Sequence, residues 1–444
     1  MKKILIILMT LLMICNYTQA KTNNNSSFYG IINESGINKD SISICIRDAQ
    51  TGNIVYSLND KMMMNPASVQ KILTMPAALE TLGSDYSFKT ELYARENDSY
   101  VIKLSGDPYL RYSELKSLIR PIERDAKKVY IDNSVLDSKI WGEGWQWDDD
   151  LNVLMPRFGA YNLDKNLIKL VITPSESGQY ALISNPSKYP MVIINKITTS
   201  NSTSINVERE TEGTDNTLKL QGTVANQTFV YVPTNNIKRY FEIRLTQALG
   251  ENKVYLQTPY TTSQISKKDA LLNSIDREIG FAINDILKNS NNMSAEIVFK
   301  LAGGKYKCEA GSDINGIEMF NNYCQKHGID SSGIKITDGS GVSKNNLVTA
   351  DFVSEFLYAN KDSEVMNYLP KPGEGTLTQR MLPIKENLRA KTGTLSGISS
   401  IAGYITTKKN HNYTFCIIQN DVKLSASDKK MLEDYIIREI YLKL

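Results

Sequence analysis

The sequence predicts a mixed α/β fold that is completed by both ends of the chain and carries a large, mainly β insertion. Apolar strands and a helix near the N-terminus are matched by strands and a helix near the C-terminus, so one sheet can be built from both ends. Between them, residues 85–262 consist of short β-like runs separated by turn residues. We therefore expect one domain from residues 27–84 and 263–444, and one or two inserted domains from residues 85–262.

The first elements are a hairpin and a helix. Residues 41–58 alternate isoleucine with polar residues around a central Gly-Asn turn, which predicts a β-hairpin. A strongly apolar segment over 68–82 predicts a helix, with Gly83 as its C-terminal stop. Pro76 lies inside this helix and is expected to kink it, because proline has no backbone N–H to donate.

The later elements follow from apolar spacing. Residues 198–216 are dense in Ser, Thr, Asn and Glu and are expected to form exposed loops and edge strands. From 267 to 303 the pattern is helical, with a Ser-Asn break in the middle. Two apolar runs, 398–405 and 413–419, predict strands on either side of a polar turn, and a last helix begins at about Ser427. Its expected apolar side is Leu432, Tyr435, Ile436, Ile440 and Tyr441.

The N-terminus has the pattern of an export signal. Residues 1–20 contain an early lysine pair, an apolar run and the small-residue ending Thr18-Gln19-Ala20. The apolar run, Ile4–Ile14, is shorter than the ~20 residues that a membrane-spanning helix needs. We predict that the signal is removed and that the mature chain is exported to the periplasm or another extracytoplasmic space, without a stable membrane anchor.

Charge, cysteine content and histidine content limit the classes of partner and of metal site that we expect. The formal net charge is +3 and no long basic run occurs, which argues against nucleic acid as a partner. Besides Cys15 the chain has four cysteines, whose spacing matches no zinc pattern, and it has only two histidines, so we expect no metal and no cofactor. In an exported protein one disulfide is possible, and Cys308 and Cys324 are the nearest pair in sequence.

A serine and a lysine at the start of the first helix form the first candidate site. Ser68 and Lys71 are one helical turn apart, so their side chains share a face within hydrogen-bonding reach. A neutral lysine can take the serine proton without a histidine. A Ser-His-Asp triad would have to use His327 or His411, and neither lies in a nucleophile-like context.

The second candidate site is the tripeptide Lys391-Thr392-Gly393 with the following Thr394. Placed at a strand edge, the lysine supplies a fixed cation and the two threonines offer hydroxyls to a substrate carboxylate. Glycine lets a substrate approach the backbone closely. The pairing of an S-x-x-K with a later K-T-G is typical of penicillin-binding proteins and serine β-lactamases.

A third element of such a site is an S-x-N, for which the chain offers two candidates. Ser290 with Asn292 interrupts two helical segments, which would present the side chains from a short interhelical loop. Ser343 with Asn345 follows a glycine-rich loop. Spacing alone leaves both open.

Together the motifs resemble the class C low-molecular-mass penicillin-binding proteins, the D-alanyl-D-alanine carboxypeptidase/endopeptidase family. The resemblance spans nearly the whole mature chain, in the family's order. The main matching segments are Pro66-Ala67-Ser68-Val69-Gln70-Lys71, Ser290-Asn291-Asn292-Met293 with Ala295-Glu296, Asp338-Gly339-Ser340-Gly341-Val342-Ser343 and Lys391-Thr392-Gly393-Thr394. Further support comes from Ser105-Gly106-Asp107-Pro108, Gly144-Trp145-Gln146-Trp147-Asp148-Asp149 and Gly375-Thr376-Leu377.

The resemblance implies a β-lactamase/transpeptidase-like domain, an antiparallel sheet with helices on both faces. It also implies a serine-type D-Ala-D-Ala carboxypeptidase or endopeptidase that acts on peptidoglycan stem peptides and is inhibited by β-lactam antibiotics. In that family two residues separate the S-x-N from a following Ala-Glu, as Met293 and Ser294 do here, which favours Ser290 and Asn292.

The resemblance also implies the role of each residue. Ser68 would attack the penultimate D-Ala carbonyl with Lys71 as base, and the backbone N–H groups of Ser68 and Thr394 would form the oxyanion hole. Ser290 would pass the proton to the leaving D-Ala, and Asn292 would hold the substrate amide. Lys391, Thr392 and Thr394 would bind the terminal carboxylate, with Gly393 beside the substrate.

Two alternatives remain from the sequence. A serine β-lactamase would differ only in fast deacylation, and the long insertion argues against it. A non-catalytic peptidoglycan-binding protein would keep the fold, and the intact motif residues argue against that. Within the insertion, an aromatic group predicts either a small core, which we favour, or a wall for the stem peptide. Its members are Trp141, Trp145, Trp147, Phe158 and Tyr161.

Overall fold

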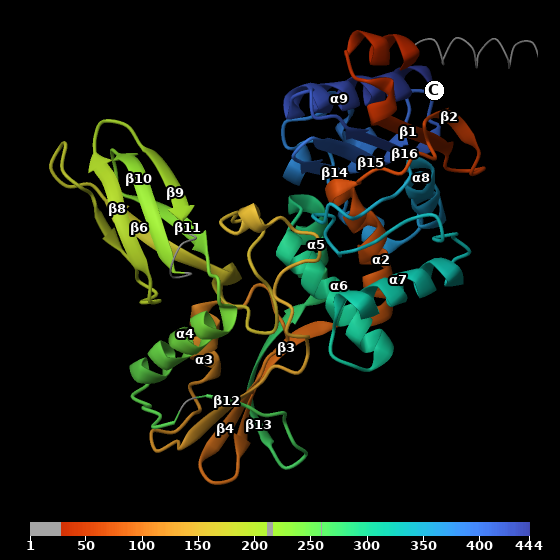
Figure 1. The fold of residues 1–444 in the computed structure, drawn as a ribbon. Helices are drawn as coiled ribbons and strands as arrows, with labels where there is room; N and C mark the ends of the chain where they lie inside the picture. The colour runs from red at the N-terminus through yellow and green to blue at the C-terminus, as the bar shows by residue number, and fades with distance from the viewer. Residues whose placement is uncertain (1–27, 211–215, 259) are drawn as a thin grey trace, which may run out of the picture. The chain divides into compact units, whose positions relative to one another are not determined.

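The computed structural model describes residues 28–210, 216–258 and 260–444 (Figure 1). The predicted signal peptide, residues 1–20, lies outside the described residues. The chain divides into two compact units. The first comprises the described residues up to Ala77, Ile283–Ser290 and Phe320–Leu444, and the second comprises Ala78–Ala282 and Asn291–Met319. These units do not follow the predicted domain boundaries residue for residue, and those boundaries stay a prediction.

The first unit contains an antiparallel sheet that is built from both ends of the chain. Among the described residues its strand order is β14-β15-β16-β1-β2. The predicted hairpin and the two C-terminal strands are all present. The strands are β1 Ile42–Asp48, β2 Ile54–Leu58, β14 Leu388–Leu395, β15 Ile398–Thr406 and β16 Asn412–Asn420.

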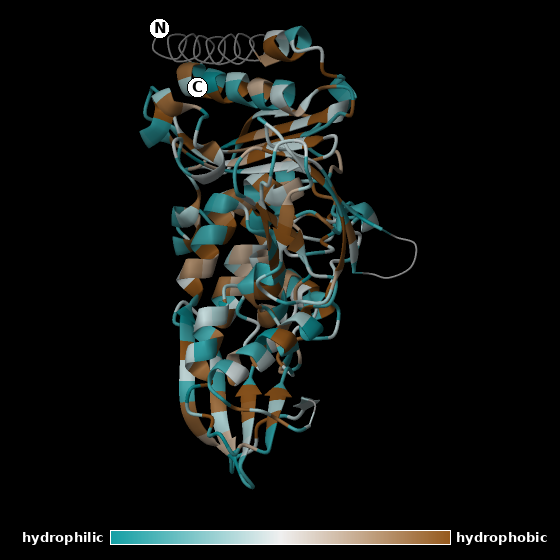
Figure 2. Cartoon of the chain, turned by 90° about the vertical axis from the view of Figure 1, so that its left-hand side faces the viewer, coloured by the Kyte–Doolittle hydropathy of each residue, from teal (hydrophilic) through white to brown (hydrophobic). Residues whose placement is uncertain are grey.

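Helices cover both faces of this sheet. On one face, α9 (Ala426–Lys443) and a short helix over residues 28–34 pack on isoleucines of β1 and β15 and form the core of the unit. On the other face lies α8 (Ala350–Ala359), which is joined to β16 by a hydrogen bond from the Thr414 hydroxyl to the Ser354 carbonyl oxygen (3.0 Å). Figure 2 shows brown hydrophobic segments in the helices and strands and teal hydrophilic residues in many of the turns between them. The predicted transpeptidase-like layering is therefore present.

The second unit holds most of the predicted insertion. Its largest sheet has the order β12-β5-β4-β3-β13, and two three-stranded sheets have the orders β8-β10-β9 and β11-β6-β7 among the described residues. The first sheet is formed by β3 Ser87–Arg95, β4 Ser99–Lys103, β5 Lys128–Asp132, β12 Thr261–Thr262 and β13 Ala270–Glu278. The others are formed by β6 Leu167–Thr173, β7 Leu182–Ser184, β8 Val192–Thr199, β9 Ser204–Arg209, β10 Thr217–Val224 and β11 Thr228–Pro233. Edge strands were predicted over residues 198–216. This prediction is confirmed for the described residues of that segment, because β8 and β9 lie at the two edges of their sheet.

The remaining helices connect these sheets. They are α2 Gln70–Leu82, α3 Tyr112–Leu118, α4 Ile237–Glu251, α5 Ile279–Asn289, α6 Asn292–Lys307 and α7 Asp313–Lys326. Short 3-10 turns are η1 Lys39–Ser41, η2 Ala67–Val69, η3 Trp147–Asp149, η4 Asp164–Asn166, η5 Glu364–Tyr368, η6 Gly375–Leu377 and η7 Leu382–Asn387. Gly83 ends α2 as predicted, with φ 89° and its N–H donated to the Leu79 carbonyl oxygen (2.8 Å).

Two element predictions were wrong. The helical pattern predicted from residue 267 begins only at α5, because residues 270–278 form β13, which pairs antiparallel with β3. Residues such as Ala, Leu and Glu favour a helix only weakly, and pairing with a neighbouring strand overrides that preference. Tyr435, placed on the apolar side of the last helix, is 50% exposed, whereas its neighbour Ile437 is fully buried.

Two further features of the structure concern helix length and the cysteines. No helix in the described part of the chain combines the length and the apolar character that crossing a membrane requires. Cys45, Cys308, Cys324 and Cys416 are all free thiols, so the possible disulfide between Cys308 and Cys324 is not formed in this structure.

Candidate active site

Ser68 lies on the tight turn η2, directly before helix α2. The turn is strained, because Ala67 adopts φ 46°, a left-handed conformation that costs an alanine roughly 1–2 kcal/mol. The Asn65 side chain holds it from within: its Oδ1 accepts the Ala67 N–H (2.9 Å) and its Nδ2 donates to the Ser343 carbonyl oxygen (2.9 Å). The surrounding structure therefore fixes the serine at one position.

Lys71 is the partner of Ser68. Its side chain is fully buried, and its Nζ lies 2.9 Å from the Ser68 Oγ and 2.7 Å from the Ser340 carbonyl oxygen. Two acceptors on different segments thus orient the amine. The predicted pairing of the S-x-x-K side chains is present in this geometry.

The loop 338–343 supplies the second of these acceptors and packs tightly on α2. The Asp338 carboxylate accepts the backbone N–H groups of Gly341 (2.8 Å) and Ser343 (2.7 Å), which closes the loop. Thr74 on α2 donates its hydroxyl to the Gly339 carbonyl oxygen (2.7 Å). A Cβ on Gly341 would lie 2.0 Å from the Ala67 carbonyl oxygen, so only glycine permits this contact.

Lys391 lies on β14, an edge strand of the first unit's sheet. Its side chain is fully buried, and its Nζ donates to the Ser290 Oγ (2.9 Å) and to the Thr392 carbonyl oxygen (2.9 Å). Burial, and secondly the charge of Lys71, lower the pKa of Lys391 well below its ordinary value of 10.5. The two buried lysines therefore act on each other electrostatically.

The rest of the K-T-G motif lies beside the serine turn. A Cβ on Gly393 would lie 2.8 Å from the Pro66 carbonyl oxygen and 2.9 Å from the Ser68 backbone nitrogen, so β14 passes directly against η2. Thr392 is buried and hydrogen-bonds Thr376 (2.7 Å), whereas Thr394 is exposed. The strand thus presents an accessible hydroxyl next to the serine.

The two S-x-N candidates are in different settings. Ser290 follows α5 with φ 64° and accepts a hydrogen bond from Lys391. Ser343 is buried in the 338–343 loop, where its backbone is tied to Asp338. The structure therefore joins Ser290, and not Ser343, to the K-T-G lysine. Asn292 belongs to the second unit, where its Nδ2 donates to the Leu154 carbonyl oxygen (3.0 Å).

Sequence reasoning missed three positioning groups. These are the Ser340 carbonyl oxygen on Lys71, the Asn65 side chain in the serine turn, and Ser400, whose hydroxyl donates to the Pro66 carbonyl oxygen (2.6 Å). A backbone carbonyl leaves no signal in a sequence, because every residue has one. The position of Asn65 directly before Pro66 was a usable signal, since Asn-Pro favours the start of a turn.

Other predicted groups have structural roles. Trp145 and Phe158 are buried with ring centroids 5.5 Å apart, and Trp141 packs edge-on to Trp145, as expected for a small aromatic core. Trp147 does not belong to it, because it is 81% exposed.

One group of potential metal ligands occurs among the described residues. The ligand atoms of Cys45, Asp60 and Asp351 lie within 4.8 Å of one another. Asp351 already forms an ion pair with Arg47 (2.6 Å), which accounts for its position without a metal.

Two curated relatives match most of the chain. The chain is 24% identical over 407 residues to the D-alanyl-D-alanine carboxypeptidase DacB of Haemophilus influenzae, covering 84% of each chain. It is 26% identical over 419 residues to the D-alanyl-D-alanine carboxypeptidase of Actinomadura sp. strain R39, covering 85% of this chain and 77% of that protein.

Solved structures show the same fold. Penicillin binding protein 4 from Haemophilus influenzae superposes with a TM-score of 0.79 at 22% identity, covering 90% of this chain and 96% of that one. A predatory endopeptidase from Bdellovibrio bacteriovorus gives a TM-score of 0.52 at 16% identity, with 90% of each chain covered.

The family comparison covers nearly the whole chain. The model of the D-Ala-D-Ala carboxypeptidase 3 (S13) family matches residues 27–438, which include every motif from Ser68 to Thr394. The predicted class of penicillin-binding protein is thereby confirmed. The chain belongs to the D-Ala-D-Ala carboxypeptidase 3 (S13) family.

Proposed function

We propose that the protein is a serine-type D-Ala-D-Ala carboxypeptidase or endopeptidase in which Ser68 is the nucleophile and Lys71 its base. The observation that carries the assignment is the buried Lys71 amine 2.9 Å from the Ser68 hydroxyl. The Ser340 carbonyl oxygen holds the amine in that position. A neutral Lys71 would take the hydroxyl proton as Ser68 Oγ attacks the penultimate D-Ala carbonyl carbon, which forms a tetrahedral intermediate.

The neighbouring strand would stabilise this intermediate. The Ser68 backbone nitrogen lies against Gly393 on β14, so the N–H groups of Ser68 and Thr394 can be directed at one carbonyl oxygen. Lys391, together with the Thr392 and Thr394 hydroxyls, would bind the terminal carboxylate of the stem peptide.

Departure of the terminal D-Ala needs a proton on its nitrogen. Ser290 accepts a hydrogen bond from Lys391 and is the group we assign to this transfer. Asn292 follows two residues later and would hold the substrate amide. Water then hydrolyses the acyl-enzyme ester and regenerates Ser68.

The same steps cleave a D-Ala cross-link, which is the endopeptidase reaction. Because peptidoglycan lies outside the cytoplasm, the protein would work in the periplasm or another extracytoplasmic space. A β-lactam would acylate Ser68 in the same way and remain attached.

Intact mass after incubation with benzylpenicillin tests the assignment. We expect one penicillin adduct on the wild type and none on Ser68→Ala. Ser113→Ala is the matched control, because Ser113 and Lys116 have the same S-x-x-K spacing on α3, and this variant should keep the adduct. Penicillin hydrolysis without an adduct would indicate a β-lactamase. Intact penicillin without an adduct would favour a non-catalytic wall-binding protein.

A further inference from the structure

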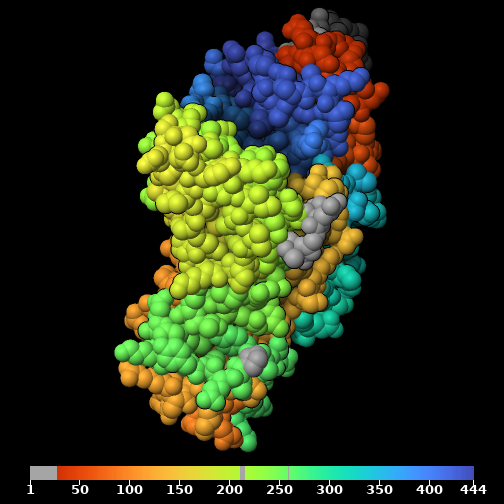
Figure 3. Space-filling model, turned by 60° about the vertical axis from the view of Figure 1, so that its left-hand side comes forward, coloured from red at the N-terminus to blue at the C-terminus, as the bar shows by residue number. Residues whose placement is uncertain are grey.

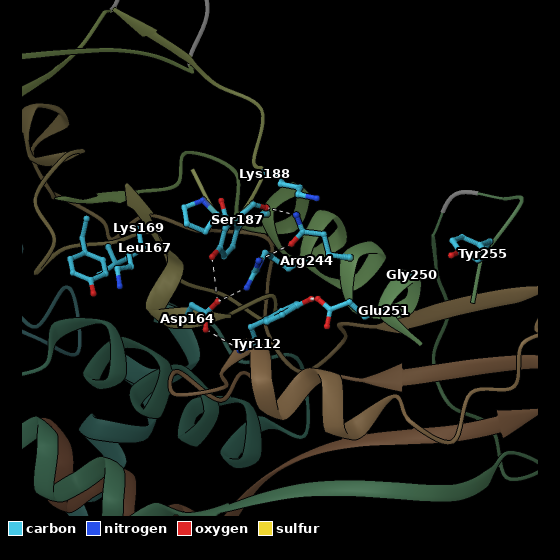
Figure 4. A pocket seen from close by; sticks show the side chains of 14 residues that line it. Tyr112, Asp164, Leu167, Lys169, Ser187, Lys188, Arg244, Gly250, Glu251 and Tyr255 are labelled. Atoms are coloured by element: carbon cyan, nitrogen blue, oxygen red, sulfur yellow. Dashed lines mark hydrogen bonds and ion pairs between the residues drawn. The ribbon is translucent and has the colours of Figure 1, made fainter. Parts of the chain in front are cut away.

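A large cavity opens in the second unit, and none of the proposed catalytic residues lines it. Its volume is about 820 Å³, within the range of roughly 300–1,000 Å³ that ligand sites occupy. Helix α4, the start of α3, the turn at Ser187 and strands β6 and β11 form its walls (Figure 4). Figure 3 shows the yellow and green surface over β6–β11 and α4 as continuous.

The inner wall of the cavity is held rigidly. The Arg244 guanidinium stacks on the Tyr112 ring, with its Cζ 3.6 Å from the ring centroid, and its Nη2 lies 3.8 Å from the Asp164 Oδ2. Gln247 accepts a hydrogen bond from Arg244 (2.7 Å) and donates one to the Ser187 carbonyl oxygen (2.6 Å). Figure 4 shows Arg244 and Tyr112 pointing toward each other between Asp164 and Glu251. A wall fixed in this way loses little entropy when a ligand binds.

Exposed aromatic rings continue from the cavity along the sheet. Tyr231 on β11 lines the cavity and is 48% exposed, and Phe229, two residues away on the same face, is 49% exposed. Opposite Tyr231 in the register is Lys169, whose Nζ lies 3.6 Å from the Phe229 ring centroid. We name Phe229, Tyr231 and Lys169 the aromatic strip. The two aromatic positions are about 7 Å apart along the strand, so both rings can contact one extended ligand.

Both carboxylates that line the cavity already have hydrogen-bond donors. The Asp164 carboxylate accepts the Tyr112 backbone N–H (2.9 Å), and Glu251 accepts the Tyr112 hydroxyl (2.7 Å) and pairs with Lys116. Lys188, which also lines the cavity, forms no ion pair among the described residues. A ligand that suits the site therefore has ring faces for the aromatic strip and carboxylates for Lys188 and Lys169.

We propose that the cavity and the aromatic strip bind the glycan strand of peptidoglycan. Its amino-sugar rings offer apolar C–H faces to Tyr231 and Phe229. A lactyl group carries a free carboxylate wherever its stem peptide has been removed. The identity of the polymer rests on the proposed function. A stem peptide is the other part of peptidoglycan, but it has no series of ring faces to match the strip.

Calorimetric titration with peptide-free glycan strands, released from peptidoglycan by an amidase, tests the proposal. We expect the wild type to bind and the Phe229→Ala/Tyr231→Ala double variant to bind at least about 10-fold weaker. Thermal unfolding of the double variant should match the wild type, because both side chains are half exposed. Tyr435→Ala is the matched control, since it removes an equally exposed tyrosine (50%) in the first unit and should leave glycan binding unchanged.

The salt dependence of glycan binding tests whether Lys188 contacts a carboxylate. Binding to Lys188→Gln should be weaker and should depend less on salt, because one carboxylate contact is lost. Wild-type protein that is acylated by benzylpenicillin yet does not bind glycan would overturn the inference alone. Failure of acylation would overturn the proposed function instead. Displacement of bound glycan by a free pentapeptide, with the peptide's own binding lost in the double variant, would reassign the cavity to the stem peptide.

Discussion

Lys71 and Lys391 are two fully buried amines in one site, and their charges oppose each other. Each amine is held by hydrogen bonds to a hydroxyl and to a backbone carbonyl oxygen. Burying an ammonium group is costly unless its donors are satisfied, and these acceptors lower that cost. Burial and the nearby charge of Lys71 both make Lys391 hold a proton less firmly than an ordinary lysine does.

The lowered pKa of Lys391 predicts an alkaline limit to activity. If the protonated amine binds the substrate carboxylate, kcat/KM should fall as pH rises through a value well below 10.5. In Lys391→Arg the guanidinium stays protonated, so this fall should move to higher pH even though the rate itself drops. The shape of the pH–rate profile is the measurement. If the alkaline fall in kcat/KM occurs at the same pH in Lys391→Arg, a group other than Lys391 causes it.

Gly393 is predicted to be essential for the geometry of the serine turn. A Cβ there would lie 2.3 Å from the Ser400 Oγ and 2.9 Å from the Ser68 backbone nitrogen, so Gly393→Ala must displace the turn. A displacement near 1 Å at a reacting group costs about 100-fold in rate. We expect a loss of this order in benzylpenicillin acylation. Gly333→Ala is the control, because its Cβ would meet nothing within 4 Å, and an equal loss in both variants would contradict the prediction.

At the residue scale the sequence was sufficient to select candidate side chains that the structure brings into contact. Ser68, Lys71 and Lys391 could be selected because hydroxyl and amine side chains at fixed spacing are visible in a sequence. Ser290 could be preferred over Ser343 only through the family resemblance, since both have the same local spacing. The carbonyl oxygen of Ser340 could not be predicted, because its position depends on how a distant loop packs on α2.

At the scale of elements, α9 is joined to β15 by a buried hydrogen bond and to the segment between η6 and η7 by an ion pair, as well as by apolar packing. Glu433 on α9 is fully buried and accepts hydrogen bonds from Arg380 (2.8 Å) and from the Ser399 hydroxyl on β15 (2.7 Å). Burial raises the pKa of Glu433, and the Arg380 charge opposes that rise. The carboxylate therefore depends on Arg380 to remain ionised.

Removing Arg380 should leave a buried charge without its partner. We expect Arg380→Met to lower the free energy of unfolding by about 3–5 kcal/mol at neutral pH, as measured by urea denaturation. Without the arginine the pKa of Glu433 rises further above its unfolded value. The folded state then binds the extra proton more readily, so the deficit should shrink as pH falls.

A second substitution tests whether the unpaired Glu433 carboxylate causes the loss of stability. Glu433→Gln in the Arg380→Met background removes the buried carboxylate and should recover part of the lost stability. A deficit that is the same at neutral and mildly acidic pH, with no recovery in the double variant, would mean that Arg380 stabilises by packing alone.

Elements with a clear local alternation of apolar and polar residues could be predicted from the sequence, whereas β13 could not. The hairpin over 41–58 and the strands at the C-terminus alternate clearly, and all of them form. Residues 270–278 contain helix-favouring residues, and Leu271 and Leu272 are both exposed on the strand that they form. Their conformation is set by pairing with β3, which lies far away in the sequence.

At the scale of the whole molecule, the catalytic sheet depends on both termini. Strand β1 from the N-terminal part pairs with β16 from the C-terminal part, and β14 at the edge carries Lys391. The sheet cannot form in full until β16 has been synthesised, because the second unit lies between these strands in the sequence. Such long-range pairing slows folding and makes the C-terminus structurally important.

Deletion of α9 is therefore predicted to prevent folding of the first unit. Leu432, Ile436, Ile437 and Ile440 are buried to 98% or more against the sheet. Each contributes ~1.5–3 kcal/mol, so the four together are comparable with the entire stability of ~5–15 kcal/mol that a protein of ordinary stability has. A chain that ends at Ser425 should lose acylation by benzylpenicillin and become sensitive to limited proteolysis.

The solvent side of the same helix provides the control for that deletion. Tyr435 is 50% exposed and Met431 is 48% exposed, so Met431→Ala/Tyr435→Ala should keep both acylation and protease resistance. Comparing this variant with the truncated chain shows whether the buried face of α9, rather than its exposed side, is needed for folding. If the truncated chain were still acylated at the wild-type rate, the sheet would have to be stable without its cover on that face. The core of the first unit would then lie between the sheet and α8, and the packing of β15 on α9 would contribute little.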